Sequence, residues 1–410
     1  MVKLRDYQEE IVQKGAEILD KNWLLFLCLE TRLGKTIVAL TIAKKMGFKN
    51  VVFFTKRKVI SSIKNDLKKL DFDVDIIKVK VQSVDSAHKE KAEFDLVIVD
   101  ESHTLGAFPK PSLRAKNIKK IVKSNSLICL SATPTPESYS QIYHQLWVSE
   151  NSPFAHYKNF YRWADDYVNK KERMINGYRV TDYSHCYVDS LKPVIEPIML
   201  SYTQKQAGFI HSDVKEKIVT VEINPRLHQV LKQLKNSRII ETKDWAIVCD
   251  TPAKLKSKMH QLCSGTVKDE DGNIHFLDYS KAAFIKSKFH GKTVIFYKYI
   301  GEYEILKAVF PEHYTDPQEF NEAPSGVFIS QFQSGREGIR LDTADHLIYY
   351  NIDFSFLSYE QAKNRIMDIE REKMPVLYWL FSDTGLEREI YKVVKKKRNF
   401  TSYYFKKFIA

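Results

Sequence analysis

The chain has 410 residues, enough for two or three domains with substantial hydrophobic cores. Hydrophobic residues make up 44% and charged residues 28%, which excludes a disordered or fibrous protein and is typical of a globular one. The formal net charge of +13 favours a polyanionic partner such as nucleic acid over simple solubility.

The cysteines and the apolar runs narrow the class of protein further. The five cysteines include no CxxC pair, so we expect reduced thiols, with neither a structural zinc site nor a disulfide framework. The longest apolar run, residues 23–29, is far shorter than a membrane span, and the N-terminus has no signal-peptide pattern. We therefore expect a cytoplasmic protein with no membrane partner.

Two stretches of the chain alternate apolar strand-like runs with helix patterns. In the first stretch, residues 1–150, the predicted strands are 24–29, 51–54, 96–99 and 127–130. In the second stretch, residues 276–410, they are 293–297, 327–330, 346–350 and 376–381. The first four runs are apolar without alternation, as in parallel strands that are covered on both faces. We predict an α/β fold with two lobes, each built on a parallel sheet.

The region between these stretches, residues 151–275, fits neither lobe and is predicted to be an inserted, aromatic-rich segment. Aromatic side chains such as Phe160 and Trp163 crowd residues 154–187. They could stack on nucleic-acid bases, but we favour packing in the core of a small insertion. Residues 267–276 predict a β-hairpin around Asp271-Gly272.

Residues 30–36, with the sequence ETRLGKT, join the first apolar run to a helix pattern that ends at Gly47. A turn of this kind holds phosphate oxygens with its backbone amides and the positive end of the following helix. Lys35 would then reach the β- and γ-phosphates of a nucleotide, and Thr36 would bind Mg²⁺. The loop is irregular, because Leu29 and Arg32 stand where such loops commonly have small residues. The loop residues expected to bind ATP are Thr31, Arg32, Leu33, Gly34, Lys35 and Thr36.

A second motif, Asp100-Glu101-Ser102-His103, directly follows the run at 96–99. Side chains at the carboxyl end of a buried parallel strand lie at the edge of the sheet where ligands bind. Asp100 can hold Mg²⁺, commonly through water, and Glu101 can polarise an attacking water as a general base. An ordinary acidic strand end is the alternative, and the preceding GKT loop argues against it.

Two weaker signals accompany these motifs. Ser131 and Thr133 follow the run at 127–130 and could sense a γ-phosphate or couple two lobes, although a simple turn gives the same pattern. Gln8, in the N-terminal sequence LRDYQ, has an amide that can pair with both the donor and the acceptor edge of adenine. By itself this residue could equally belong to an exposed helix start.

In chain order, the LRxYQ, GKT, DESH and SAT motifs resemble the first lobe of superfamily-2 helicases. The second stretch narrows the resemblance to the Swi/Snf-like branch of that superfamily. Residues 292–296 resemble the opening strand of its second lobe, 259–264 the preceding element, 330–345 its motif V and 361–365 its motif VI. The resemblance covers nearly the whole chain except much of 151–255, and it is strongest to compact phage-type forms.

The resemblance implies two RecA-like lobes with an ATP cleft between them, and a nucleic-acid-dependent ATP hydrolase with ATP and Mg²⁺ as cofactors. It implies a helicase-type translocase that moves on DNA, most naturally duplex or branched DNA. Lys35, Glu101 and Arg365 would be its catalytic residues, with Arg365 stabilising charge on the transferred phosphoryl group. The other residues implied are Gly338 and Arg371 for ATP, Ser131, Thr133, Gln361 and Asp368 for coupling, and Thr55, Lys56, Arg57 and Arg340 for nucleic acid.

One departure from the family concerns motif VI. Asp368 stands where the family has a second arginine, so Arg365 acts alone or Arg371 replaces the missing cation. We hypothesise that Arg32 and Asp368 pair across the closed cleft. Two other functions stay open, namely a strand-separating helicase on RNA or single-stranded DNA, and a degenerate ATPase that serves as a nucleic-acid-binding scaffold. We expect a monomer, in the host cytoplasm if the chain is phage-encoded.

Overall fold

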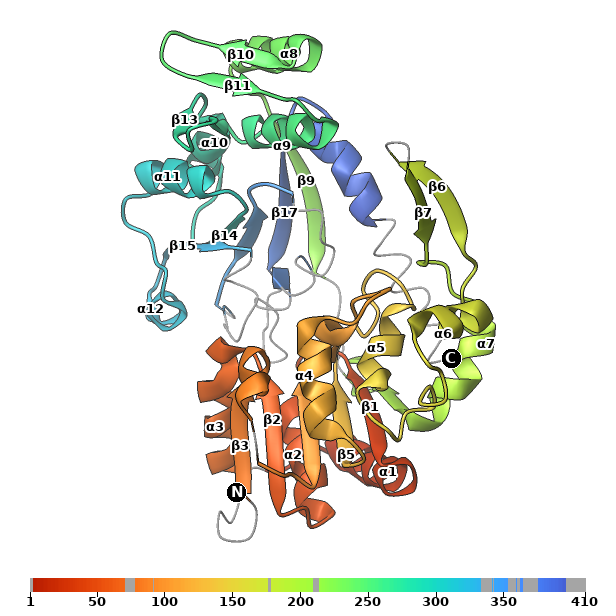
Figure 1. Ribbon diagram of the computed structural model, residues 1–410. Helices are drawn as coiled ribbons and strands as arrows, with labels where there is room; N and C mark the ends of the chain where they lie inside the picture. The colour runs from red at the N-terminus through yellow and green to blue at the C-terminus, as the bar shows by residue number, and fades with distance from the viewer. Residues whose placement is uncertain are drawn as a thin grey trace. The chain divides into compact units, whose positions relative to one another are not determined.

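The structure is a computed structural model. It describes residues 3–70, 78–90, 92–175, 178–208, 214–332, 341, 343–352, 359, 362–363 and 375–395. The chain divides into two compact units, with the boundary between residues 210 and 211, and each unit is built on a parallel sheet (Figure 1). Among the described residues, the helices are all too short or too polar to cross a membrane.

The first unit contains a six-stranded parallel sheet in the order β3-β2-β4-β5-β1-β8. Its strands are β1 (Leu24–Leu29), β2 (Asn50–Thr55), β3 (Lys78–Ser83), β4 (Leu96–Asp100), β5 (Ser126–Leu130) and β8 (Met199–Tyr202). Its helices are α1 (Asp6–Asn22), α2 (Lys35–Lys45), α3 (Ile60–Lys69), α4 (Leu113–Val122), α5 (Gln141–Trp147), α6 (Phe160–Tyr167) and α7 (Val188–Ile195). A two-stranded antiparallel ribbon, β6 (Lys171–Ile175) and β7 (Tyr178–Asp182), follows α6.

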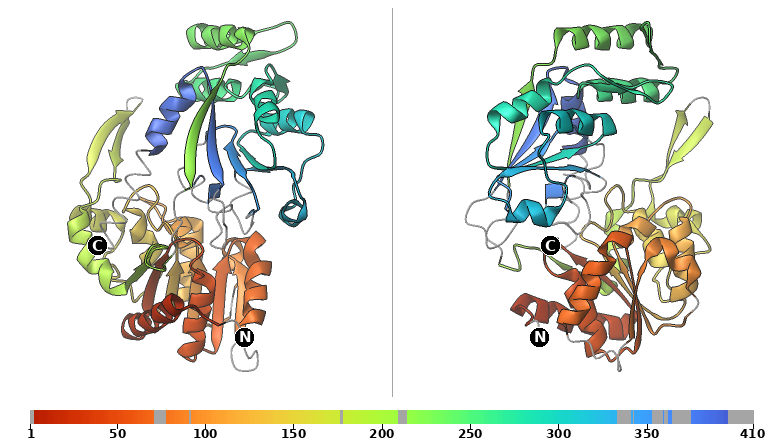
Figure 2. Two further views of the ribbon diagram at one scale, coloured as in Figure 1. Left: turned by 180° about the vertical axis from the view of Figure 1, so that it is seen from behind. Right: turned by 90° about the vertical axis from the view of Figure 1, so that its left-hand side faces the viewer.

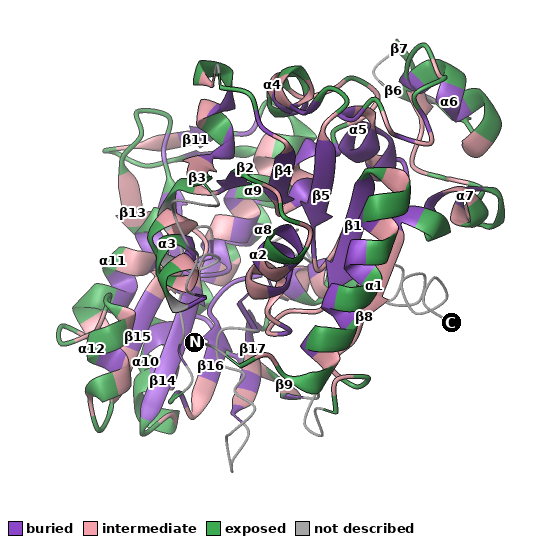
Figure 3. Ribbon diagram, turned by 90° about the horizontal axis from the view of Figure 1, so that it is seen from below, coloured by how far each residue is buried: buried purple, intermediate pink, exposed green. Residues whose placement is uncertain are grey.

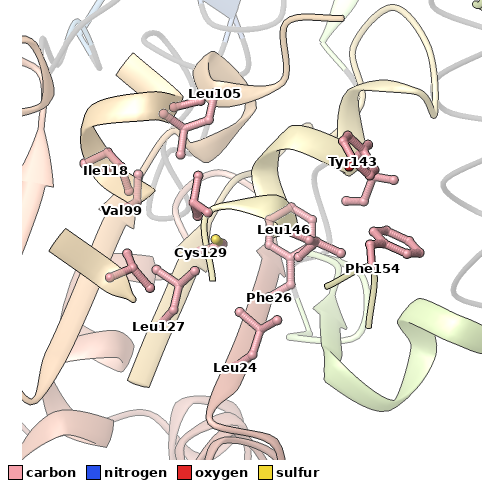
Figure 4. Packing of buried hydrophobic residues seen from close by; sticks show 14 of the residues in the cluster. Leu24, Phe26, Val99, Leu105, Ile118, Leu127, Cys129, Tyr143, Leu146 and Phe154 are labelled. Carbon is pink, nitrogen blue, oxygen red and sulfur yellow. The ribbon is translucent and has the colours of Figure 1, made fainter. Parts of the chain in front are cut away.

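Successive side chains of each central strand pack into hydrophobic cores on opposite faces of the sheet, because side chains in a strand point alternately to its two faces. In β1, Leu24, Phe26 and Cys28 pack with the side of the sheet that α4, α5, α6 and α7 cover (Figure 4). Leu25, Leu27 and Leu29 face α1, α2 and α3 on the other side. Figure 3 shows the result, with buried strands between helices whose outer faces are exposed. Burial on both faces explains why these strands are continuously apolar in sequence.

The second unit contains a five-stranded parallel sheet in the order β15-β14-β16-β17-β9. Its strands are β9 (Lys215–Val221), β14 (Lys292–Tyr297), β15 (Gly326–Gln331), β16 (His346–Tyr349) and β17 (Val376–Ser382). Its helices are α8 (Pro225–Ser237), α9 (Pro252–Leu262), α10 (Ser280–Lys288), α11 (Ile300–Val309) and α12 (Pro317–Glu322), and residues 386–395 are helical as well. Two hairpins, β10 (Ile239–Glu241) with β11 (Ala246–Val248) and β12 (Thr266–Lys268) with β13 (Ile274–Phe276), lie beside α8 and α9.

The predicted fold class is confirmed, and all eight predicted strands are present with ends that differ by no more than one residue. The sequence prediction missed β3, β8 and β9. All three are edge strands of the two sheets, whereas the fourth edge strand, β15, was predicted. In β3 polar and apolar residues alternate from Lys78 to Gln82, and β9 begins with three charged residues, 215–217, so neither strand produces a continuous apolar run.

The structure divides the predicted middle segment, residues 151–275, between the two units. Residues up to 202 share the core and the sheet of the first unit, whereas β9 joins the sheet of the second. The segment is therefore not a unit by itself, because its strands complete the two flanking sheets. Phe160 and Trp163 are buried in the core, as predicted, and the hairpin around Asp271-Gly272 is present.

Candidate nucleotide site

The carboxyl ends of β1, β2, β4 and β5 bring the motif residues of the first unit together at one edge of its sheet. The loop after β1 contributes Lys35, the end of β2 contributes Thr55, and the ends of β4 and β5 contribute Asp100 and Ser131. In a parallel sheet this is the edge at which ligands bind, because each strand delivers its loop to the same side.

The loop between β1 and α2 has a left-handed backbone at two positions, Arg32 (φ 68°) and Gly34 (φ 79°). Glycine adopts this conformation without cost, whereas a residue with a side chain is destabilised there by roughly 1 kcal/mol. Gly34 also has no room for a side chain, because a Cβ atom would lie 2.5 Å from Nε2 of Gln8. At the other end of the loop, Nζ of Lys35 donates a hydrogen bond to the carbonyl oxygen of Leu29 at 3.2 Å.

Gln8 braces this loop from α1. Its Oε1 accepts a hydrogen bond from the backbone N–H of Arg5 at 3.0 Å, and its Nε2 donates to the carbonyl oxygen of Leu33 at 3.1 Å. The side chain is buried, so both ends of its amide have protein partners in this structure. The pairing of Gln8 with adenine stays a prediction. It would require the hydrogen bonds with Arg5 and Leu33 to be replaced by hydrogen bonds with the base.

The segment after β8 also supports the loop, and the sequence reasoning missed it. The N–H of Glu30 donates to the carbonyl oxygen of Tyr202 at 3.0 Å, and Oε2 of Glu30 accepts from the N–H of Gln204 at 2.7 Å. Nε2 of Gln204 donates to the carbonyl oxygen of Thr31 at 3.0 Å. The only sequence signal was the short apolar run at 198–200, which is too short to identify a strand.

Asp100 lies between two hydrogen-bond donors. Its Oδ2 accepts from Oγ1 of Thr55 at 2.9 Å, and its Oδ1 accepts from the N–H of Glu101 at 3.0 Å. Burial raises the pKa of Asp100, and the negative charge of Glu101 raises it further. Thr55 and the nearby charge of Lys35 oppose these effects, and the resulting pKa is about 6. Asp100 is therefore a buried carboxylate beside a second negative charge, and a cation near it would stabilise its charged form.

Glu101 has the opposite shift. Burial acts to raise its pKa, but the hydrogen bond from His103 and the charges of His103, Lys35 and Lys56 outweigh burial and lower the pKa to about 2. Nδ1 of His103 lies 3.1 Å from Oε2 of Glu101. Glu101 therefore carries its negative charge at neutral pH, as polarisation of a water molecule requires.

His103 connects the ends of β4 and β5. Its Nδ1 also lies 3.3 Å from Oγ of Ser131, a fully buried hydroxyl that accepts a hydrogen bond from the N–H of Thr133 at 3.1 Å. A second link passes through Gln145 of α5, which accepts from Oγ of Ser102 at 3.0 Å and donates to the carbonyl oxygen of Pro134 at 2.7 Å. No local pattern could identify Gln145, because it lies 43 residues from its partner Ser102 in the chain.

The residues predicted to contact nucleic acid after β2 occupy different environments. Thr55 is 1% exposed, and its hydroxyl is directed to Asp100, so the structure corrects its predicted role as a surface contact. Lys56 is half-buried, and its charge acts on Glu101, whereas Arg57 is exposed at the start of the short helix Arg57–Val59. Of these three side chains, Arg57 is the one at the surface.

Several predicted site residues of the second stretch lie outside the described residues. They are Gly338, Arg340, Gln361, Arg365, Asp368 and Arg371. The hypothesised pair of Arg32 and Asp368 therefore stays a prediction.

The residues of this edge fit a nucleoside triphosphate with a divalent cation. Lys35 and the N-terminus of the eleven-residue helix α2, which begins after Gly34, suit phosphate oxygens. Asp100 and Thr36 offer oxygen ligands of the kind that Mg²⁺ prefers. The raised pKa of Asp100 supports a cation at this position, since a bound cation would compensate the excess negative charge.

Comparisons with known proteins identify the family of the chain. A family model for the SNF2-related domain matches residues 39–267, a range that contains both Asp100 and Ser131. The match covers more than half of the chain, so the chain belongs to the SNF2-related family. The resemblance to the Swi/Snf-like branch of superfamily-2 helicases is thereby confirmed.

Individual relatives are distant. The chain is 20% identical over 367 residues to Protein CHROMATIN REMODELING 4 of Arabidopsis thaliana, an alignment that covers 80% of this chain and 16% of that protein. It is 21% identical over 453 residues to the Uncharacterized ATP-dependent helicase YqhH of Bacillus subtilis (strain 168). That alignment covers 95% of this chain and 77% of that protein. It is also similar to the Sulfolobus solfataricus SWI2/SNF2 ATPase core in complex with dsDNA, with 15% identity, a TM-score of 0.44 and coverage of 98% and 92%.

Proposed function

We propose that the chain is a DNA-stimulated ATPase that couples ATP hydrolysis to movement along duplex or branched DNA. The observation that carries this proposal is the carboxylate pair of Asp100 and Glu101 at the sheet edge of an SNF2-related chain. Thr55 and His103 hold the two carboxylates, and the charge of Lys35 acts on both. This arrangement supports phosphoryl transfer to water, in which the protein positions groups and stabilises charge.

Each residue of the edge has a distinct task in this proposal. Lys35 and the amides at the start of α2 bind phosphate oxygens, while Asp100 and Thr36 would hold a magnesium ion. When bound, such an ion would supply positive charge that neutralises and polarises the phosphates. Glu101, ionised at neutral pH, orients the attacking water. Arg365 supplies the positive charge for the transferred group.

The contacts of His103 support a link between hydrolysis and the rest of the unit. Because His103 contacts both Glu101 and Ser131, a change in the surroundings of Glu101 reaches the loop after β5 directly. Gln145 joins the same two strand ends from α5. In this proposal Ser131 and Thr133 couple the nucleotide site to movement, together with Gln361 and Asp368.

The net charge of the chain and the name of a relative support DNA as the polymer along which the protein moves. The net charge of +13 suits a motor that grips backbone phosphates and needs no readout of bases. The relative from Bacillus subtilis is named an ATP-dependent helicase. The proposed phosphate contacts are Arg57, exposed after β2, together with Lys56 and Arg340.

The test is ATP hydrolysis by the purified chain with forked DNA, blunt duplex, single-stranded DNA or RNA at one salt concentration. The proposal expects the strongest stimulation with duplex or forked DNA, and Lys35→Ala serves as the control for contaminating activity. Stimulation by RNA or single strands alone would favour a strand-separating helicase. Nucleic-acid binding without hydrolysis under any condition would favour the scaffold alternative and overturn the ATPase.

A further inference from the structure

The ribbon of β6 and β7 extends away from α6 and α7 of the first unit (Figures 1 and 2). Its cross-strand pairs run from Lys171–Asp182 at the base to Ile175–Tyr178 near the turn. Paired residues share a face, and successive pairs alternate between the two faces. Met174 and Arg179 lie on one face and Tyr178 on the other, and all three side chains are exposed. The outer part of the ribbon therefore packs against neither side of the unit.

The ribbon exposes large apolar side chains. Tyr178 is 76% exposed, Met174 is 68% exposed and Val180 is 44% exposed. Tyr161 of α6 and Tyr187, just before α7, are exposed near its base. Single exposed apolar residues are ordinary, but a group on one projecting element is typical of an interaction surface.

Charge indicates which partner fits this surface. Residues 170–182 contain four basic side chains and two acidic ones. The acidic Glu172 pairs with Arg179 across the ribbon at 3.3 Å, and Lys170 pairs with Asp165 of α6. The net positive charge, interleaved with a tyrosine and a methionine, suits a polyanion with flat apolar faces. Nucleic acid has both properties, since its bases stack on aromatic rings and its phosphates attract cations.

The base of the ribbon is fastened to the loop that follows β5. Oγ of Ser138 donates to the carbonyl oxygen of Ser184 at 2.7 Å, and Oγ of Ser140 donates to the carbonyl oxygen of Tyr183. On the other strand, the N–H of Asn169 donates to the carbonyl oxygen of His185 at 2.7 Å. Ser138 and Ser140 lie in the same loop between β5 and α5 as Thr133.

The same loop contacts the nucleotide site. Gln145 joins its Pro134 to Ser102, the neighbour of Glu101 in sequence. Direct contacts therefore run from the catalytic strand end, through the loop after β5, to the base of the ribbon. This continuity favours an element that works with hydrolysis over a surface unrelated to it.

We propose that the β6–β7 ribbon contacts DNA, with Tyr178 stacking on an unpaired base at a fork or junction while its basic residues hold phosphates. This inference rests on the proposed function, and it adds a specific contact to branched DNA.

The test compares Tyr178→Ala/Met174→Ala with Leu113→Ala, which shortens an equally exposed apolar side chain on α4. Binding of each protein to a fluorescent fork and to a blunt duplex is measured by anisotropy at one salt concentration. Loss of a stacked base is expected to weaken fork binding by about fivefold or more, with a smaller effect on blunt duplex. ATP hydrolysis without DNA is expected to equal that of the wild type, and Tyr178→Phe is expected to keep fork binding.

A second measurement detects the contact directly. Forks with 5-iodouracil at the unpaired position are irradiated, and the cross-linked peptide is identified by mass spectrometry. A cross-link at Tyr178 supports the inference. If hydrolysis by the wild type responds to no DNA, the proposed function fails. If it responds but the double variant binds forks as tightly as Leu113→Ala and no cross-link forms on residues 171–182, the ribbon inference is overturned, and the exposed surface is assigned to a protein partner.

Discussion

The carboxyl edges of the two parallel sheets differ in how their buried charged side chains are paired. At the carboxyl edge of the first sheet, Asp100 lies beside Glu101, and its pKa is raised first by burial and further by the negative charge of Glu101. At the corresponding edge of the second sheet, buried ions compensate one another. Nζ of Lys281 lies 2.6 Å from Oε1 of Glu387 and donates to the carbonyl oxygens of Tyr350 and Leu380, both at 3.1 Å.

Further buried polar groups among the described residues of this edge are paired in the same way. Oε2 of Glu387 accepts from Oγ of Ser382 at 2.7 Å, so both carboxylate oxygens have partners. Buried Glu302 accepts from the N–H of Lys298 at 2.8 Å and from the side-chain amide of Asn351. These bonds tie α10 and α11 to the ends of β16 and β17. The edge of the first sheet is therefore suited to bind a charged ligand. The charged groups at the edge of the second sheet instead bind one another and hold the strand ends in place.

The substitution with the largest expected effect is at the carboxyl edge of the first sheet, and it is measured as the rate of ATP hydrolysis. Glu101→Gln keeps the size and some hydrogen bonds of the side chain but removes its charge, so turnover of ATP is expected to fall about a thousandfold. Steady-state hydrolysis with saturating DNA measures it. Glu137→Gln, the same change at an exposed position, is the control and is expected to leave turnover unchanged. Near-normal turnover in Glu101→Gln would reject its assignment as the catalytic carboxylate.

The next effect tests the second edge through stability. Lys281→Met leaves the buried charge of Glu387 without its partner, which is expected to lower the free energy of unfolding by about 3–5 kcal/mol. Urea unfolding followed by circular dichroism measures the loss. Lys281→Met/Glu387→Leu removes both charges, and it is expected to recover a large part of the stability. A loss below about 1 kcal/mol in the single variant would show that this pair does not fix the edge.

A smaller effect concerns a histidine in the helical layer of the first unit. Burial lowers the pKa of His144 to about 4, against a hydrogen bond with the carbonyl oxygen of Ala107 that raises it. The unfolded chain therefore takes up this proton first, so stability is expected to fall as pH drops from about 6.5 towards 4. His144→Gln is expected to reduce that fall by about 2 kcal/mol, whereas His88→Gln, at an exposed position, leaves it unchanged. Equal pH slopes for wild type and His144→Gln would contradict the prediction.

The smallest effect sharpens the contrast at the nucleotide site itself. Because the pKa of Asp100 is raised to about 6, its charge opposes folding above that pH, and the cost disappears as the pH falls below about 4. In metal-free buffer at pH 8, Asp100→Asn is expected to raise the free energy of unfolding by about 1 kcal/mol while it abolishes hydrolysis.

Asp95→Asn is the matched control for that measurement. Two backbone N–H groups, from Lys49 and Asn50, donate to the carboxylate of Asp95 at 2.8 Å. This substitution is therefore expected to destabilise the protein, since an amide accepts through its oxygen alone and a backbone N–H cannot accept in return. The Thr55 hydroxyl that donates to Asp100 can instead turn and accept from an amide. If Asp100→Asn lowers the free energy of unfolding at pH 8, the charge of Asp100 does not oppose folding and the prediction is contradicted.

Much of the site followed from local sequence, but several of its supports did not. The strand-then-glycine pattern located Lys35, and the acidic pair after an apolar run located Asp100 and Glu101. Thr55 was identified as a functional residue but with the wrong partner. Its hydroxyl contacts Asp100 because β2 and β4 pair in a register that aligns Phe54 with Val99. Nothing in the local sequence around Thr55 encodes that register.

The two parallel sheets and the strand ends with the catalytic residues could be predicted from the sequence. Central strands that are buried on both faces must be apolar throughout, and this requirement is visible in a single chain. Three edge strands, β3, β8 and β9, and the distant residues that hold the loops, such as Gln204 and Gln145, became visible in the folded structure alone. Edge strands need not be continuously apolar, and contacts between segments far apart in the chain depend on strand order and register, so the composition of neither segment reveals them.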